Sequence, residues 1–221
     1  MYYSPEVSFI SLGPSCVVEQ NIVHRFKDRS GSVFDYNVSS IDGLIQCLDL
    51  YKNGQLAEAI GNIDNYHNIG FVIENYGDKY VHKDIDLFAL YHEKNTDELM
   101  GKIVHSIENL GRESKKKYFV WSNIQSNVGW IIRFLGKDAS SIYLSQDNYR
   151  KIQDKVYEVF QSEVIFLTKT NYCDPSILSN DNVYIIENPD VDSVYEGNRA
   201  YGDQQMFSKI FNKYIDIAKQ V

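Results

Sequence analysis

Short apolar runs alternate along this chain with longer segments in which apolar residues recur every three or four positions. The runs at 7–12, 117–122, 163–169 and 182–188 have the length and composition of buried strands. Helical spacing covers five segments, namely 16–26, 40–60 with a break near Gly54, 96–110, 146–160 and 204–219. Strands separated by helices in this order predict an α/β fold, a three-layer sandwich with a mainly parallel sheet and helices on both faces.

One segment departs from this alternation. Residues 70–90 carry two strand-like runs around Tyr76, Gly77 and Asp78, a pattern that predicts a β-hairpin. A further stretch at 128–135 has a partly helical pattern. The chain has no Pro-, Gly- or Ser-rich linker, so we expect one catalytic domain over residues 1–221.

Composition and charge narrow the classes of partner. The net charge of -8 disfavours nucleic acid, whose phosphates need a concentrated basic surface. We expect a cytoplasmic protein without a membrane span, because the N-terminus lacks the pattern of a secretory signal and no long apolar run is present. We expect no cofactor and no metal, since nucleotide fingerprints, CxxC pairs and HExxH spacing are all missing from the sequence.

The candidate chemistry centres on Cys16, which follows the strand at 7–12 and opens the helix at 16–26. A thiol in the first turn of a helix faces unpaired N–H groups and the positive end of the helix dipole, which favour the nucleophilic thiolate. Gly13 permits a close turn, Ser15 can cap the helix, and N–H groups from Ser15 onward could stabilise an oxyanion. Two alternatives stay open at this point, a buried cysteine that only packs and a phosphate-binding turn.

The run ISLGPSCVVEQNIVHRFKDRSGSVFDYNVSS at 10–40 resembles the opening of the bacterial papain-like cysteine peptidases of a domain family of unknown function. In that family a strand ends in SLG, a Cys follows, and a PFDW-like motif comes later; Val33 and Tyr36 depart from that motif here. The segments GDKYVHKDIDLF and AYGDQQMFSKIF resemble its later markers. The resemblance implies that Cys16 is the nucleophile and His82 the general base, with Asp35 a third catalytic member or a structural anchor. The papain-like label also implies a helical lobe with the Cys and an antiparallel sheet with the His, whereas the strand pattern favours the sandwich.

Other polar residues have simpler explanations. Asp84 or Asp86 could orient the ring of His82. Asn123, after the strand at 117–122, could contact substrate or an oxyanion, although hydrogen bonding within a turn explains it as well. The remaining histidines fit surface positions, except His24, which lies too far along its helix to reach Cys16. Cys47 fits a helical core position, Cys173 an exposed loop, and Asp203 a helix N-cap.

Three functions follow from these residues. The first is a cysteine-dependent acyl-transfer hydrolase, a peptidase or amidase that uses a Cys16–His82 pair on a peptide or other acyl substrate. The second is an esterase or acyltransferase of the SGNH type acting on a glycan, although its serine is a cysteine here and its DxxH signature is missing. The third is a non-catalytic module in which the seventeen tyrosines help to bind a sugar or peptide.

Overall fold

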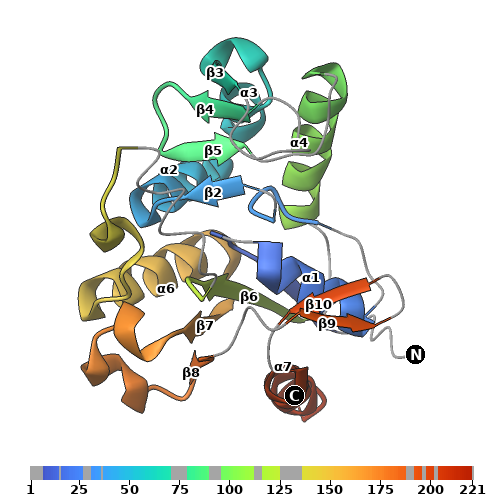
Figure 1. Cartoon of the computed structure of the whole chain (residues 1–221), viewed down its shortest axis with the longest axis vertical. Coiled ribbons are helices and arrows are strands. Elements are labelled where there is room, and N and C mark those ends of the chain that lie inside the picture. Colours follow the sequence, from blue (N-terminus) through green and yellow to red (C-terminus); the bar gives the residue numbers. More distant parts are fainter. Residues whose placement is uncertain are drawn as a thin grey trace.

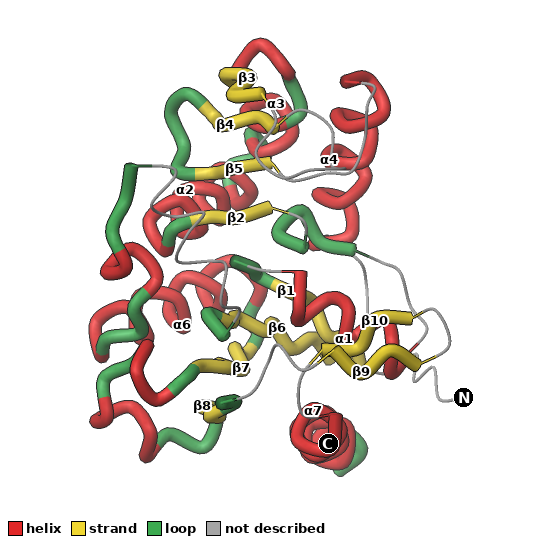
Figure 2. Tube along the Cα trace, viewed as in Figure 1, coloured by secondary structure: helices red, strands yellow, loops and turns green. Residues whose placement is uncertain are grey.

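The structure is a computed structural model of the chain. It describes residues 7–14, 16–26, 31–35, 37–70, 79–89, 96–111, 116–124, 136–187, 192–195, 198–201 and 204–220. Figure 1 shows these segments in the colours of the sequence, and Figure 2 distinguishes helices, strands and loops. The stretch at 128–135 and the tip of the expected hairpin at 76–78 lie outside the described residues.

A four-stranded sheet in which every pairing is parallel forms the centre of the fold. Its order is β1-β6-β7-β8, with bounds Val7–Ser11, Lys116–Ser122, Glu163–Thr168 and Val183–Ile185. Phe9 pairs with Tyr118, Tyr118 with Glu163, and Phe166 with Val183. The predicted α/β sandwich with a parallel sheet is confirmed. In this order β1 and β8 are the edge strands of the described sheet.

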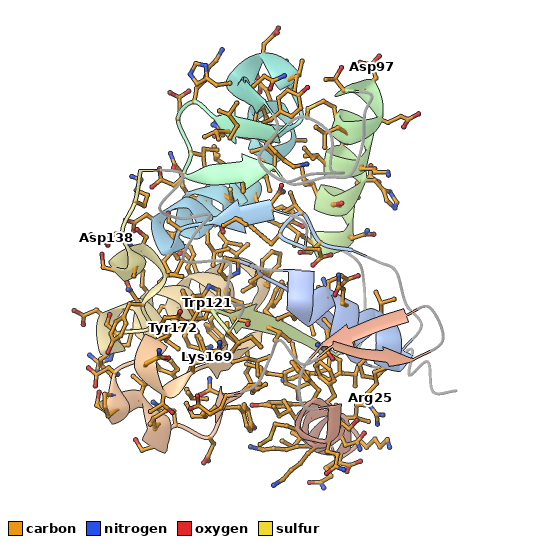
Figure 3. The ribbon with its side chains drawn as sticks, viewed as in Figure 1. Arg25, Asp97, Trp121, Asp138, Lys169 and Tyr172 are labelled. Atoms are coloured by element: carbon orange, nitrogen blue, oxygen red, sulfur yellow. The ribbon has the colours of Figure 1, made fainter. Side chains whose placement is uncertain are left out.

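Helices cover both faces because each strand alternates its side chains between two apolar clusters. One face, with Phe119, Trp121 and Phe166, packs against α2 (Ile41–Lys52) and α6 (Gln146–Phe160). The other, with Phe9 and Tyr118, packs against α1 (Cys16–Phe26) and α7 (Gln204–Ala218). Figure 3 shows Trp121 between the sheet and the helices of the first face. Each such fully buried large side chain stabilises the fold by roughly 1.5–3 kcal/mol.

Local signals set the helix ends where the sequence predicts them. The Ser40 hydroxyl accepts from Gly43 N at the start of α2, and the Ser145 hydroxyl accepts from Asn148 N at the start of α6. The break near Gly54 separates α2 from α3 (Leu56–Ile60). α4 spans Thr96–Leu110, and short 3₁₀ turns lie at Ile63–Asn65, Ala139–Ile142, Thr170–Tyr172 and Pro175–Ser179.

A second sheet is antiparallel and carries His82. Its order is β2-β5-β4-β3, with bounds Asn37–Ser39, Leu87–Ala89, Lys79–His82 and Tyr66–Gly70. In Figure 1 it lies above the parallel sheet, with β2 nearest to α1. Inside the predicted hairpin segment 70–90 the described antiparallel pair is β4–β5, whereas β3, the other partner of β4, lies almost entirely before that segment.

A two-stranded antiparallel ribbon completes the described part of the fold. It consists of β9 (Asp192–Tyr195) and β10 (Asn198–Tyr201), and β10 packs beside α1. The sequence pattern did not predict it. Across the described helices, none combines the length and the apolar character that crossing a bilayer requires.

Candidate functional site at the β1–α1 turn

The turn between β1 and α1 lies at the carboxyl end of the parallel sheet, the edge at which open α/β sheets bind ligands. Leu12 N–H donates to Val120 O at 2.9 Å, so the pairing with β6 continues past the end of β1. Gly13 has a φ of 71°, in the left-handed region that favours glycine, and its carbonyl accepts from Ser122 N at 2.9 Å. α1 then begins at Cys16, which places this residue in the first turn of a helix, as its position in the sequence predicts. Ser15 and the side chain of Cys16 lie outside the described residues.

The segment 31–35 packs directly against this turn. A Cβ atom at Gly13 would lie 3.2 Å from the carbonyl oxygen of Phe34, a tight contact, and the positive φ of Gly13 also disfavours any other residue there. The Ser32 hydroxyl donates to Ser11 O, in the last residue of β1, and accepts from Phe34 N at 3.1 Å. Gly13 N in turn donates to the Ser11 hydroxyl at 3.2 Å. The segment and the turn therefore form one hydrogen-bonded unit.

Asp35 is the fully buried acid of this unit. Ser32 N donates to its Oδ2, Ser32 Oγ lies 3.4 Å from its Oδ1, and the Ser11 hydroxyl also hydrogen-bonds to the carboxyl group. Burial raises the pKa of Asp35 well above its usual value, and the hydrogen bonds from Ser32 and Ser11 lower it only in part. These described partners are all uncharged and all belong to the turn or its neighbour. They are the contacts of a structural anchor.

A second acid, Glu19, lies on α1 one turn after Cys16 and is 4% exposed. A Cβ atom at Gly31 would lie 2.8 Å from Asp35 Oδ2 and 3.9 Å from Glu19 Oε1, so both acids approach the backbone of Gly31. Sequence reasoning missed Glu19, Ser32 and Ser11. The spacing of Ser32 and Asp35, three residues apart, is a local signal that could have found Ser32, because Ser and Asp at this spacing often bond each other's backbone; Glu19 and Ser11 have no such signal.

Asn123 follows β6 at the same edge of the sheet. Its Nδ2 donates to Ile142 O at 2.9 Å and to Tyr172 O at 3.1 Å, which uses both hydrogens of the amide. Its backbone N–H donates to Leu167 O at 3.2 Å. Lys169 and Tyr172, labelled in Figure 3, belong to the loop after β7 and make a cation–π contact of 5.9 Å. The side chain of Asn123 therefore ties two loops together and has no donor left for an oxyanion.

His82 is held by backbone groups of the antiparallel sheet. Its Nδ1 accepts from Asp84 N at 3.1 Å and from Ile85 N at 3.0 Å, so the proton of the neutral ring is on Nε2, which lies 3.0 Å from Ala59 O. The ring also makes an edge contact with Tyr66 at 4.9 Å. Both ring nitrogens are thus hydrogen-bonded to backbone groups and not to a side-chain acid.

The structure does not bring His82 to the β1–α1 turn. β2, which contributes the Asn37 carbonyl near Gly13, is separated from β4 by β5, so His82 lies across two strand spacings, about 10 Å. Asp84 contacts the ring through its backbone N–H alone, and the carboxylate of Asp86 is 2.9 Å from Lys137 Nζ. Neither acid orients the ring as the sequence suggested.

The other cysteines and histidines have structural or surface positions. Cys47 is fully buried, and burial raises the pKa of its thiol to about 12, which confirms its predicted core position. Cys173 is 2% exposed, so its predicted exposure in a loop is wrong; the bridge between Leu144 and Cys173 draws this loop into the core. His67 and His105 are exposed as predicted, whereas the side chains of His24 and His92 and the expected cap Asp203 lie outside the described residues. Within the described ranges, no three His, Cys, Asp or Glu side chains cluster as metal ligands.

Comparison with family models, curated proteins and solved structures finds no match to this chain. The resemblance of residues 10–40 to the papain-like peptidase family therefore stays an expectation. The candidate site rests on its own geometry.

Proposed function

We propose that this chain is a cysteine-dependent acyl-transfer hydrolase, a peptidase or amidase whose nucleophile is Cys16. The observation that carries the proposal is the position of Cys16, which opens α1 at the carboxyl end of the parallel sheet. A helix N-terminus lowers the pKa of a thiol and offers backbone N–H groups to an oxyanion. The unit of Ser11, Ser32 and Asp35 supports the proposal because it fixes the turn that leads into α1.

In the proposed reaction the Cys16 thiolate attacks the acyl carbon, and the C–N bond breaks. The amine leaves with one proton, which balances the proton lost by the thiol. Water then hydrolyses the thioester, releases the acid and restores the thiol. The hydrogen bonds of His82 favour a structural role, so the proposal rests on the thiol and the turn and not on a Cys–His pair.

The test is the reactivity of Cys16 with iodoacetamide as a function of pH, followed by mass spectrometry of the peptide that contains it. We expect a midpoint clearly below that of a free thiol, which titrates at about 8.5. Cys47 is the internal control, since its thiol is fully buried and we expect it to stay unmodified in the folded protein. A midpoint at or above the free-thiol value overturns the proposal.

A binding module is the second candidate, because none of the histidine rings that the structure describes contacts the β1–α1 turn. Amide and ester probes with the same acyl group separate the remaining possibilities. An adduct that is lost in Cys16→Ala supports catalysis, and preference for the amide supports a peptidase or amidase over a glycan esterase. An inert thiol with retained binding of sugar or peptide supports the module.

A further inference from the structure

Two buried asparagines near the carboxyl end of the parallel sheet each have a side-chain oxygen without a hydrogen-bond partner among the described residues. They are Asn123, directly after β6, and Asn37, the first residue of β2. Asn123 is fully buried and Asn37 is 2% exposed, so bulk water solvates neither oxygen. An unpaired buried acceptor is costly, and in native proteins such an atom usually bonds an ordered water or a ligand.

The orientation of each amide is fixed by its nitrogen. Nδ2 of Asn123 donates to two backbone carbonyls, those of Ile142 and Tyr172. Nδ2 of Asn37 donates to the carbonyl of Val33. A carbonyl oxygen only accepts, so exchanging the oxygen and the nitrogen of either amide would break these bonds. Both side chains therefore present an acceptor, and not a donor, to the group beside their Oδ1 atoms.

Gly13 connects the two asparagines. Its carbonyl accepts from the N–H of Ser122, the residue before Asn123, at 2.9 Å. A Cβ atom at Gly13 would lie 3.7 Å from the backbone oxygen of Asn37. Both amides thus belong to the surroundings of one turn.

The topology of the sheet independently marks this place for a ligand. β1 and β6 are neighbours in the sheet. α1, which follows β1, packs on one face, whereas α6, the first α-helix described after β6, packs on the other. In open α/β sheets, ligands bind in the crevice at the carboxyl ends of such a strand pair.

We propose that Asn37 and Asn123 form a binding site for a ligand that carries an uncharged amide N–H group, which their Oδ1 atoms accept. Two oxygens that offer only lone pairs repel the oxygens of a carboxylate or phosphate, so the site selects against anions. This inference goes beyond the proposed function, because a binding module would use the same acceptors and the thiol takes no part in them. It also changes the expected role of Asn123 from an oxyanion donor to a substrate acceptor.

The test is a proton–nitrogen NMR titration of the wild-type chain with N-methylacetamide and with methyl acetate. The two probes have the same shape and differ in an N–H group against an oxygen, and they are small because both acceptors are buried. The signals followed are the side-chain amides of Asn37 and Asn123. Asn182 is the matched control, because its Oδ1 accepts from the Tyr149 hydroxyl at 2.9 Å and its Nδ2 donates to Val164 O at 2.9 Å.

We expect N-methylacetamide to shift the signals of Asn37 and Asn123 with a dissociation constant of about 1 to 100 mM, a range that suits so small a ligand. Methyl acetate should bind at least about tenfold more weakly, because it leaves the acceptors unpaired. The signal of Asn182 should stay in place. Asn37→Ala should weaken binding of N-methylacetamide about tenfold, whereas Asn182→Ala should leave the affinity unchanged.

Equal affinity for the two probes overturns the inference. So does the absence of shifts at Asn37 and Asn123 with either probe, which assigns both oxygens to resident water. Since the titration is carried out on the wild-type chain, it stays decisive if Asn37→Ala does not fold. Neither outcome bears on the thiol, and a Cys16 alkylation midpoint equal to that of a free thiol, with a positive titration, overturns the proposed function alone.

Discussion

Replacement of His82 by alanine separates the structural role of this residue from the catalytic role that the family resemblance implies. The change removes the acceptor of two backbone N–H groups, at Asp84 and Ile85, and the contact of Nε2 with Ala59 O. Three hydrogen bonds at about 0.5–1.5 kcal/mol each, and the edge contact with Tyr66 at about 0.5–1.5 kcal/mol, give a loss of roughly 2–6 kcal/mol in the free energy of unfolding. His82 is 7% exposed, so water replaces these partners poorly.

The assay is urea denaturation followed by circular dichroism, with the alkylation profile of Cys16 measured on the same samples below the transition. His67→Ala is the matched control, because His67 is exposed on the neighbouring strand β3, and we expect a change within about 0.5 kcal/mol. His82→Ala should lower the unfolding free energy and leave the pH midpoint of Cys16 alkylation where it is in wild type. The reasoning is refuted if His82→Ala is as stable as His67→Ala and its Cys16 midpoint shifts, since that pattern belongs to an imidazole paired with the thiol.

Two further predictions concern stability. Because burial raises the pKa of Asp35, the folded chain retains a proton that the unfolded chain loses above about pH 4, so stability should fall as pH rises from there toward the raised pKa. Asp35→Asn should flatten this fall in urea unfolding at pH 4.5 to 8, and an unchanged slope would show that Asp35 is ionised in the folded state. Lys155 of α6 pairs with Asp49 of α2 at 2.7 Å and with Glu158 of its own helix at 2.6 Å, so Lys155→Met should lower the unfolding midpoint at low salt, with the difference shrinking in about 1 M NaCl. A difference that persists at high salt would point to packing of the lysine stem instead.

The ends of the helices were predictable because they depend on local chemistry. The start of α1 at Cys16, the Ser40 cap of α2, and the span of α6 from Gln146 to Phe160 agree with the sequence pattern. Each depends on residues within one turn of the helix end, which a sequence displays directly. The parallel sheet was predictable for a related reason, since strands buried on both faces are continuous apolar runs.

The partners of the candidate site residues were not predictable from the pattern. Asp35 is 24 residues from Ser11 along the chain, yet the two share a hydrogen bond, and Ser32 links them. His82 has a sequence context that resembles a catalytic marker, but the antiparallel sheet turns its ring toward Tyr66 and Ala59. The sequence predicts Cys173 in an exposed loop, whereas its bridge with Leu144 places it in the core.

The sequence pattern predicts the four parallel strands, the helical segments and the position of one thiol at a strand-to-helix turn, because each follows from the period of apolar residues and from nearby caps and glycines. The folded arrangement alone shows that β1 lies at an edge of the described parallel sheet, that Asp35 bonds to Ser11 and Ser32, and that His82 bonds to backbone groups. These features depend on which distant segments meet. A hydrogen bond between residues that are far apart in the sequence does not change the pattern of apolar residues in either segment.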